Sequence, residues 1–371
     1  MRKKLKEVCD FYSGTGFPVK YQGENDGELP FYKVGDIANN ATAGNVYLSL
    51  CNNFISHDVA KEIKGTIIPS DVVVFAKIGE ALKLNRRAIT ACDCLIDNNA
   101  MGIGGKSEYL NSMYFYFYMK NLKMETLAES TTVPSVRKTK LEEIEIDVPT
   151  LAEQSEIVDI LAKLQKVINE RQEQLEKLDE LIKARFVELF GDPRSNPLGY
   201  EKKPLGNTCK VITGNTPSRK VTEYYGDYIE WIKTDNIVSG LLHPTKASEC
   251  LSEKGVLEGR TVNENAILMA CIAGSVASIG RVCITDRRVA FNQQINAVVP
   301  EQYNILFLYI LLQISKDYLV EDINMALKGI LSKSKLEEKE FFVPPMELQK
   351  EFAEFVAQVD KSKFAFAYIM Q

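Results

Sequence analysis

Apolar residues recur at alternating spacings of four and three through the middle of the chain, for more than four heptads. This period predicts one long amphipathic helix whose apolar seam packs against another helix. Arg171 and Arg185 interrupt the seam, and we expect them to fix its register or to pair with carboxylates of a partner. The seam positions are Ile157, Leu161, Leu164, Ile168, Arg171, Leu175, Leu178, Ile182, Arg185 and Leu189.

Both ends of this helix have sequence signals. Thr150 and Glu153 have the spacing of a capping box, which predicts the N-terminus. Gly191 followed by Pro193 predicts the C-terminus. At 1.5 Å per residue the helix from 152 to 190 measures about 58 Å, too long for the core of one small domain.

The chain also repeats itself. The run Lys-Leu-Glu-Glu at 140–143 returns at 335–338, an offset of 335 − 140 = 195 residues. Each half is therefore predicted to be one globular unit followed by one helix, with segments 1–149, 150–191, 192–344 and 345–371. A duplicated unit of this kind suits a ligand with two half-sites, such as DNA. The other matches are Val148-Pro149 with Val343-Pro344, Gln154 with Gln349, and Lys33 and Ile37 with Lys233 and Ile237.

The last segment has the same four-three alternation as the central helix. We expect the two helices to pair as an antiparallel coiled coil if a pseudo-two-fold axis relates the halves. The counterpart of Phe190 is position 190 + 195 = 385, whereas the second helix stops at Gln371. Part of the central helix is therefore expected to keep an unpaired seam that needs another chain. The C-terminal seam positions are Leu348, Phe352, Phe355, Val359, Ser362, Phe366 and Ile369.

Within each globular half, strand and helix signals are mixed. Residues 66–68 and 72–75 have the pattern of short buried strands, and 266–270 repeats it. Aromatic amphipathic helices are predicted over 109–122 and 303–318. The expected fold class is α+β, with two similar globular domains separated by long helices.

Charge is distributed unevenly along this chain of 371 residues and net charge −5. Residues 153–188 carry nine acidic and six basic side chains, whereas basic residues gather in the globular halves. An acidic protein can still present a basic face to a polyanion. The sequence has no apolar run of the roughly 20 residues that span a bilayer and no secretory signal, so the expected location is cytoplasmic, without a membrane partner.

Enzyme and metal motifs are weak or missing. The eight cysteines are spread out and only two histidines are present, so no zinc spacing appears and reduced, mostly buried thiols are expected. The run 102–107 resembles the end of a phosphate loop but lacks the first glycine, since Ala100 stands there. Asp71, Glu80 and Lys83 loosely resemble a nuclease triad that the other half does not repeat.

Four stretches resemble a known family, the specificity subunits of type I restriction-modification systems. Residues 149–157 resemble the P-x-x-E-Q-x-x-I entry to the long helix of that family, and 185–191 are similar to its end. Residues 231–237 and the stretch 279–294 resemble the framework of its target recognition domains. The likeness covers nearly the whole chain in the right order; the short C-terminal helix departs from it.

The resemblance implies a subunit without catalysis or a bound cofactor of its own. Two target recognition domains would bind the half-sites of a double-stranded DNA target, with the helices as a ruler. The helices would dock two methyltransferase subunits and, with them, restriction subunits. The methyltransferase would flip out and methylate an adenine with S-adenosylmethionine, and the restriction subunit would use ATP.

Candidate site residues follow from the chemistry of base reading, which needs Arg, Lys, Asn or Gln on loops. The expected DNA-binding residues are Lys77, Lys83, Arg86, Arg87, Arg137, Lys138, Arg219, Lys220, Lys233, Lys328 and Lys333. The expected partner-binding residues, on the distal part of the central helix, are Leu175, Leu178, Leu181, Ile182, Phe186 and Leu189.

Two other functions stay open on the sequence. The chain could be a coiled-coil scaffold whose globular ends bind protein without reading DNA. An enzyme with an unrecognised site is the weakest reading, because the motifs that it needs are missing.

Overall fold

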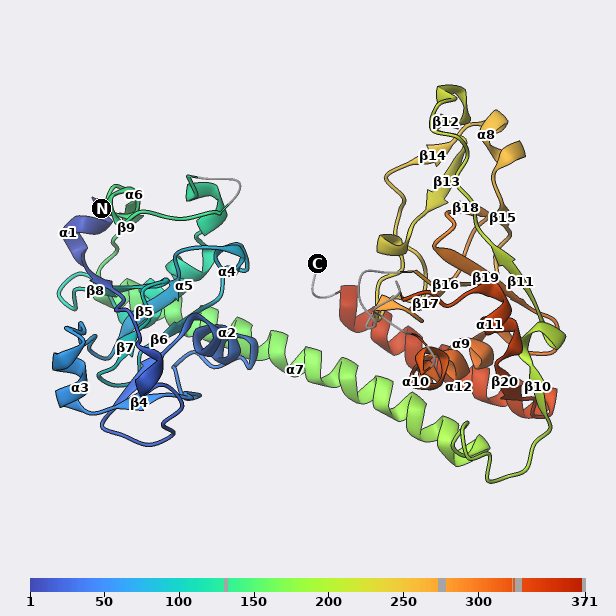
Figure 1. Cartoon of the computed structure of the whole chain (residues 1–371), viewed down its shortest axis with the longest axis horizontal. Coiled ribbons are helices and arrows are strands. Elements are labelled where there is room, and N and C mark those ends of the chain that lie inside the picture. The colour runs from blue at the N-terminus through green and yellow to red at the C-terminus, as the bar shows by residue number, and fades with distance from the viewer. Residues whose placement is uncertain (130–132, 273–277, 322, 324–328, 369–371) are drawn as a thin grey trace. The chain divides into compact units, whose positions relative to one another are not determined.

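A computed structural model describes residues 1–129, 133–272, 278–321, 323 and 329–368, and side chains only as far as residue 363. The chain divides into two compact units, residues 1–168 and 169–371, and each has its own sheets and core (Figure 1). Within the described residues, no helix combines the length and the apolar character needed to cross a membrane.

The first unit is built on a four-stranded antiparallel sheet in the order β2-β8-β5-β6. A three-stranded sheet, β4-β3-β7, lies beside it in the fold, and β3 runs parallel to β7. A third pair, β1-β9, joins the start of the chain to the segment before the long helix. The strands are β1 (Arg2–Lys4), β2 (Cys9–Ser13), β3 (Leu29–Tyr32), β4 (Phe54–Ile55), β5 (Val72–Ala76), β6 (Arg87–Ile89), β7 (Leu95–Ile96), β8 (Ala100–Gly105) and β9 (Glu145–Asp147).

Both faces of the four-stranded sheet are covered in the first unit. Val73 and Phe75 of β5 belong to a core that includes Phe115, and Val72 and Val74 belong to a second core on the other face. This alternation follows from the two-residue period of a strand. The helices are α1 (Leu5–Val8), α2 (Val34–Thr42), α3 (His57–Glu62), α4 (Glu80–Lys83), α5 (Ser112–Asn121) and α6 (Lys138–Glu142), with single turns at Val19–Tyr21 and Met124–Leu127.

The second unit repeats this plan. Its four-stranded sheet has the order β11-β19-β16-β17, and its mixed sheet, β12-β14-β13-β18-β15, again contains one parallel pair, β13 with β18. The pair β10-β20 corresponds to β1-β9. The strands are β10 (Lys202–Pro204), β11 (Cys209–Thr213), β12 (Tyr225–Gly226), β13 (Ile229–Ile232), β14 (Cys250–Leu251), β15 (Thr261–Val262), β16 (Ile267–Ala270), β17 (Val282–Ile284), β18 (Val289–Phe291), β19 (Ile295–Pro300) and β20 (Glu340–Phe342).

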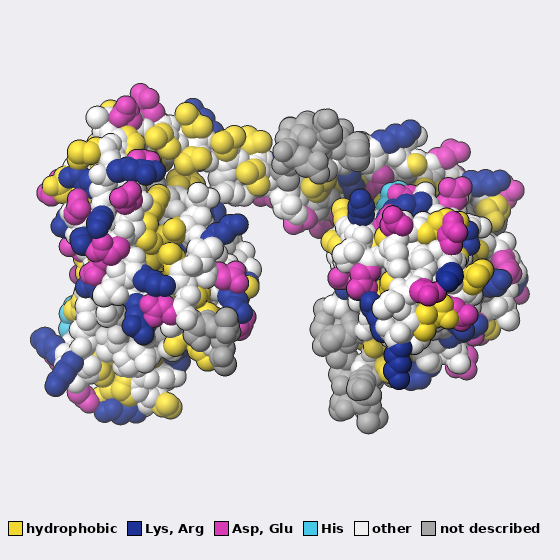
Figure 2. All heavy atoms as spheres, turned by 90° about the horizontal axis from the view of Figure 1, so that it is seen from above, with side chains coloured by type: hydrophobic (Ala, Val, Ile, Leu, Met, Phe, Trp, Pro, Cys, Tyr) yellow, Lys and Arg dark blue, Asp and Glu magenta, His cyan; other side chains and the backbone are white. Residues whose placement is uncertain are grey.

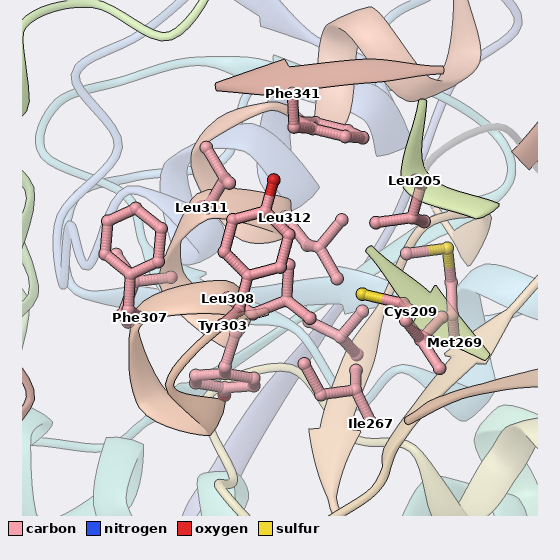
Figure 3. Close-up of a cluster of buried hydrophobic side chains, with 14 of the residues drawn as sticks. Leu205, Cys209, Ile267, Met269, Tyr303, Phe307, Leu308, Leu311, Leu312 and Phe341 are labelled. Carbon is pink, nitrogen blue, oxygen red and sulfur yellow. The ribbon is translucent and has the colours of Figure 1, made fainter. Parts of the chain in front are cut away.

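The largest core of the protein lies in the second unit, between the sheet and an apolar helix, α9. Figure 3 shows Leu308, Leu311 and Leu312 of α9 in one buried cluster with Leu205, Cys209 and Phe341. Ile267 of β16 belongs to this core while Leu268 faces the opposite one, the same alternation as in β5. The helices are α8 (Glu253–Glu258), α9 (Ile305–Ile314), α10 (Lys316–Val320), α11 (Lys333–Glu338) and α12 (Met346–Tyr368), with single turns at Leu205–Asn207, Thr222–Tyr224 and Thr234–Asn236.

Two local predictions were wrong. Residues 66–68 do not form a strand, and only an isolated bridge joins Ile68 to Cys94. The helix expected over 303–318 is broken into α9 and α10 at Ser315, which caps both. The α+β class, the repeat and the helix between the units are confirmed.

The central helix, α7, runs without a break from Leu151 to Phe190, as the heptad pattern predicts (Figure 1). The expected capping box is formed: the Thr150 backbone N–H donates to Glu153 Oε2 at 2.8 Å, and the Glu153 N–H donates back to Thr150 Oγ1 at 3.3 Å. Gly191, with φ +75, follows the last turn in the left-handed region that ends helices.

The distal part of α7 pairs with α12 inside the second unit. Phe186 packs against Phe352 with ring centroids 5.4 Å apart. Arg185 pairs with Glu351 at 3.0 Å, and Asp179, earlier on α7, pairs with Lys363, later on α12. The earlier contact residue on α7 pairs with the later one on α12, so the two helices pack antiparallel, as expected. The side chain of Phe366 and the whole of Ile369, two of the expected seam positions, lie outside the part of the chain that the structure describes.

A buried glutamine fixes the start of each helix to its own domain. Gln154 Oε1 accepts the Asn111 backbone N–H at 2.8 Å, and its Nε2 donates to the carbonyls of Tyr109 at 2.8 Å and Pro149 at 3.0 Å. Gln349 is 1% exposed and Gln154 is fully buried. Gln349 Oε1 accepts the Asn304 N–H at 2.8 Å and its Nε2 donates to the Pro344 carbonyl at 2.8 Å, so the sequence repeat at these two positions is also a repeat of hydrogen bonding.

Candidate nucleic-acid interface

At the end of strand β3 in the first unit, the chain turns into α2 through a group of polar residues around Lys33, here called the first corner. Lys33 follows the strand, and its backbone N–H donates to Asp36 Oδ2 at 2.9 Å, which starts α2. The Lys33 ammonium donates to Gln22 Oε1 at 2.6 Å and lies 5.5 Å from the centre of the Phe17 ring. These contacts hold a cation at the rim of an open hollow of about 530 Å³.

The hollow is lined by amides as well as by that lysine. Asn52 donates to Asp36 Oδ1 at 2.8 Å, so one buried carboxylate orders both Asn52 and the Lys33 backbone. Asn53, 5% exposed, accepts the Gly23 N–H at 3.0 Å. The lining residues are Gln22, Gly23, Lys33, Gly35, Asp36, Asn39, Asn52 and Asn53.

The same corner exists in the second unit with different neighbours. Lys233 follows β13, and its N–H donates to Asn236 Oδ1 at 3.0 Å, so the turn is held as it is at Lys33. Here the ammonium pairs with Glu249 at 2.8 Å instead of with a neutral amide. Glu249 also accepts from Arg219 at 2.8 Å. Hydrogen bonds from Arg219 and then Lys233 lower the pKa of Glu249 to about 2.

Aromatic rings support both cations of this second corner. The Arg219 guanidinium lies 4.4 Å from the Tyr225 ring centre and 5.1 Å from that of Trp231. Lys233 lies 5.3 Å from the Trp231 ring centre. Cation–π contacts of this length hold long side chains in one direction. Of the predicted residues, the structure therefore brings Arg219 and Lys233 together.

Predicted residues of the first unit lie on two segments that meet. The Val136 N–H donates to the Lys77 carbonyl at 2.9 Å. Lys77 and Arg137 therefore lie on neighbouring backbone segments. Lys77 and Arg86 are half-buried, and Arg137 and Lys138 are exposed. Three of the predicted cations are already paired with acids: Lys83 with Glu80 at 2.9 Å, Arg137 with Glu129 at 2.6 Å and Lys138 with Glu142 at 3.6 Å.

Arg87 was wrongly predicted to bind DNA. It lies in strand β6, is 3% exposed, and donates to Asn85 Oδ1 at 2.6 Å and to the Leu122 carbonyl at 2.5 Å. Burial lowers the pKa of Arg87 to about 10. Among the described residues, its Nε and Nη1 atoms have no hydrogen-bond partner. A guanidinium in this position cannot reach a phosphate.

The remaining predicted residues of the second unit do not form one cluster. Lys220 is exposed, and Lys333 is exposed and pairs with Glu337 at 3.4 Å on α11. Lys328 lies outside the described residues. Figure 2 shows Lys and Arg side chains lying beside Asp and Glu over the displayed face of each unit. The cations are therefore interspersed with acids on this face, and no continuous basic surface is visible there.

Sequence reasoning missed Gln22, Lys33, Asn39 and Asn52 as site residues. Lys33 marked the repeat, but Gln22 reaches it from the segment before β3, and Asn52 is brought to it by the pairing of β3 with β4. The signal that could have found this corner is the matching of Lys33 with Lys233 in the two halves. In the part of the chain that is described, no group of three His, Cys, Asp or Glu residues could hold a metal ion.

The predicted partner-binding face of α7 is only partly accessible. Ile182 and Phe186 are 2% and 0% exposed because α9 and α12 cover them, so a partner cannot reach them in this structure. Leu178 and Leu189 are half-buried against the same core, whereas Leu181 is 47% exposed. Leu175 is also half-buried. Four apolar residues nearer the helix start are exposed instead: Ile160, Leu164, Val167 and Ile168.

Comparison with known families finds one family model on both halves of the chain. The model described as the type I restriction modification DNA specificity domain matches residues 1–178 and 197–367. The chain is 23% identical over 390 residues to the type I restriction enzyme MjaIX specificity subunit of Methanocaldococcus jannaschii, covering 95% of this chain and 85% of that protein. It is 28% identical over 173 residues to the HindI specificity subunit of Haemophilus influenzae, covering 41% and 37%.

Solved structures share the fold. The S subunit of a type I restriction-modification system from M. genitalium aligns with a TM-score of 0.54 at 13% identity, over 99% of this chain and 91% of that one. A chain from a study of complex assembly and conformational transition in the type I system aligns with a TM-score of 0.53 at 17% identity, over 100% and 91%.

Proposed function

We propose that this chain, which belongs to the family of type I restriction-modification specificity subunits, recognises a bipartite double-stranded DNA target. Each globular unit reads one half-site, and α7 with α12 serves as the spacer between the two readers. The chain itself performs no catalysis and binds no cofactor. This assignment goes beyond family membership, which does not name a target.

The observation that carries the proposal is that the turn after a strand is repeated in both units, at Lys33 and at Lys233, while the polar residues around each lysine differ. Lys33 and Lys233 follow equivalent strands, and each starts its turn through the residue three positions later. Gln22 faces the first lysine, whereas Glu249 and Arg219 surround the second. A shared framework with different polar neighbours is what two readers of different base sequences need, since framework contacts position the protein and base contacts specify the sequence.

Methyltransferase and restriction subunits are the proposed protein partners. Many surface cations are already paired with acids, so partners are needed to supply part of the positive charge that DNA binding requires. The exposed apolar residues of α7 suit a docking helix for the methyltransferase subunits. S-adenosylmethionine then belongs to the methyltransferase and ATP to the restriction subunit.

The second candidate function is a protein-interaction scaffold that does not read DNA. The exposed apolar residues Ile160, Leu164, Val167 and Ile168 also favour it, since such a stripe suits any helical partner. The scaffold predicts no DNA binding that depends on salt. The two functions therefore differ in a measurement that needs no knowledge of the target.

The test combines this chain with the methyltransferase subunit of its own system. Methylated adenines in exposed genomic DNA are located by sequencing, and the expected result is one motif with two short defined parts and an undefined spacer. Affinity for DNA containing that motif should fall steeply as salt rises. A complex that binds DNA equally with and without the motif, or that binds no DNA, contradicts the proposal. The protein-interaction scaffold is then the favoured function.

A further inference from the structure

A polar hollow that is lined by none of the predicted DNA-binding residues lies beside Lys33 in the first unit. It opens to solvent, and its walls come from the segment before β3, from α2 and from the segment before β4. A buried asparagine behind the hollow fixes the backbone of its walls by hydrogen bonds. Asn40, fully buried, accepts the N–H groups of Ser49 and Leu50 at 2.9 and 3.0 Å and donates to the carbonyls of Asp36 and Leu50.

Because of this support, the polar groups at the rim are held in place. Asp36 is 5% exposed and binds both the Lys33 backbone and the Asn52 amide. Gln22 is fixed at both ends, since its Nε2 donates to the Phe17 carbonyl at 2.9 Å while its Oε1 accepts from Lys33. Donors and acceptors held in fixed directions are what discrimination between base edges requires.

Two amides at the rim have polar atoms available to a ligand. Asn39 and Asn52 are exposed at the edge of the hollow. Among the described residues, the Asn39 side chain has no hydrogen-bond partner, and Asn52 uses only its Nδ2 atom. Two glycines leave the backbone bare beside them: a Cβ added at Gly23 or at Gly35 would meet nothing within 4 Å. A broad ligand can therefore approach this wall closely.

We propose that Asn39, Asn52 and Gln22 read base edges of the first half-site from this hollow, with Lys33 supplying the positive charge that draws the duplex to it. The inference rests on the proposed function and names the residues that give the first unit its sequence preference. Asn and Gln side chains match the donor and acceptor pair of adenine in the major groove. The first half-site is accordingly expected to contain an adenine that these amides contact.

The second corner supports this division of roles. Lys33 and Lys233 occupy equivalent positions, so the lysine cannot distinguish the two half-sites. The neighbours differ in chemistry, neutral amides in the first unit and the Arg219–Glu249 pair in the second. Sequence preference therefore belongs to the neighbours, and Arg219 suits guanine rather than adenine.

The experiment uses the full chain with its methyltransferase subunit and compares methylated motifs by sequencing. The test variant is Asn39→Ala with Asn52→Ala, and the matched control is Asn121→Ala, an exposed asparagine in the last turn of α5 that does not line the hollow. The double variant should lose about ten- to a hundredfold of its preference at one or two positions of the first half-site. The second half-site should stay unchanged, which also shows that the complex still assembles.

A blocking variant covers the case in which the amide variant folds poorly. Gly35→Leu places a side chain in open space at a residue without a left-handed φ, so the fold should tolerate it. It should reduce methylation at the intact target while Asn121→Ala does not.

The outcomes separate the two proposals. Unchanged preference at both half-sites in the double variant, or an equal loss of affinity for all sequences, overturns the reading role of the hollow and leaves the proposed function standing. A wild-type complex that methylates no bipartite motif overturns both.

Discussion

Gln154 Oε1 accepts a hydrogen bond from the Asn111 backbone N–H at 2.8 Å, and Gln349 Oε1 accepts one from Asn304 at 2.8 Å. Each asparagine is the N-cap of the apolar helix that backs its own sheet. One amide therefore joins the start of a long helix to the start of a core helix, in both halves of the chain. The orientation of α7 as it leaves the first unit depends on this junction.

Replacing Gln154 by alanine should destabilise the first unit by about 1–3 kcal/mol, because one N–H and two carbonyls, all part-buried, lose their partner. The measurement is the calorimetric transition of that unit, supported by amide hydrogen exchange at Asn111. Gln172→Ala is the matched control, since Gln172 is exposed on the same helix and should change stability by no more than about 0.5 kcal/mol. Equal effects of the two changes would contradict the role of the junction.

Phe352→Ala should destabilise the second unit by about 3–5 kcal/mol, the cost of emptying a fully buried aromatic site. Its ring lies 5.4 Å from Phe186 and 5.6 Å from Phe190, so both helices lose contacts. Phe355→Ala, on the same helix but only half-buried, should cost less than half as much. Chemical unfolding of the second unit measures both; a larger loss at Phe355 would show that α12 packs through another face.

Arg87→Ala should change mainly the stability of the first unit, whereas Arg86→Ala should change mainly DNA binding. Arg87 is buried, so its loss should cost stability, about 1–3 kcal/mol, and leave the salt dependence of DNA affinity unchanged. Arg86 is half-exposed, and its loss should reduce the slope of log affinity against log salt by about 0.9 if it contacts a phosphate. A reduced slope in correctly folded Arg87→Ala protein would refute its assignment to the core.

The two corner lysines should differ in their effect on salt dependence. Lys33 pairs with a neutral amide and keeps its charge available, whereas Glu249 compensates Lys233. Lys33→Ala should therefore lower the salt slope by about 0.9, and Lys233→Ala should lower it by much less. Titrations of the complex with target DNA at several salt concentrations measure both. Equal slopes in the two variants would show that Glu249 leaves Lys233 when DNA binds.

Acid should weaken the second unit through Glu249. Its pKa of about 2 lies below the usual value of about 4.3, so the carboxylate stabilises the fold above about pH 4. That contribution is lost as the pH falls from about 4 to about 2. The side chain is 36% exposed, so solvent screens part of the effect.

Glu249→Gln should therefore lower stability at neutral pH and match the wild type near pH 2. Thermal unfolding of the second unit between pH 2 and 7 measures this, with Glu264→Gln, an exposed glutamate, as the control. A constant difference across that range would exclude the ion pairs as its source.

The long helix was predictable because its signals are local. The heptad seam, the Thr150–Glu153 box and Gly191 each act within a few turns of the helix, and all three behave as the sequence indicates. The break at Ser315 was not predictable, because the apolar pattern continues through it. Tertiary packing decides where such a run ends.

The candidate site was predicted poorly because its parts are distant in sequence. The hollow joins residues 22, 33, 39 and 52, which come from the segment before β3, from the N-cap and body of α2 and, through the pairing of β3 with β4, from the segment before β4. Arg87 illustrates the reverse error, since a basic side chain next to Arg86 looked like a loop residue and lies in a strand. Charge on a sequence does not show which side of a sheet a residue faces.

The paired glutamine junctions make the two halves interchangeable at their borders. The Lys-Leu-Glu-Glu runs at 140–143 and 335–338 lie just before these junctions and are identical. If each half reads one half-site, as proposed, recombination between the corresponding stretches of coding sequence would exchange one half for another and keep the junction intact. Under that proposal, a new pair of half-sites would arise in one crossover, without gradual change in either half.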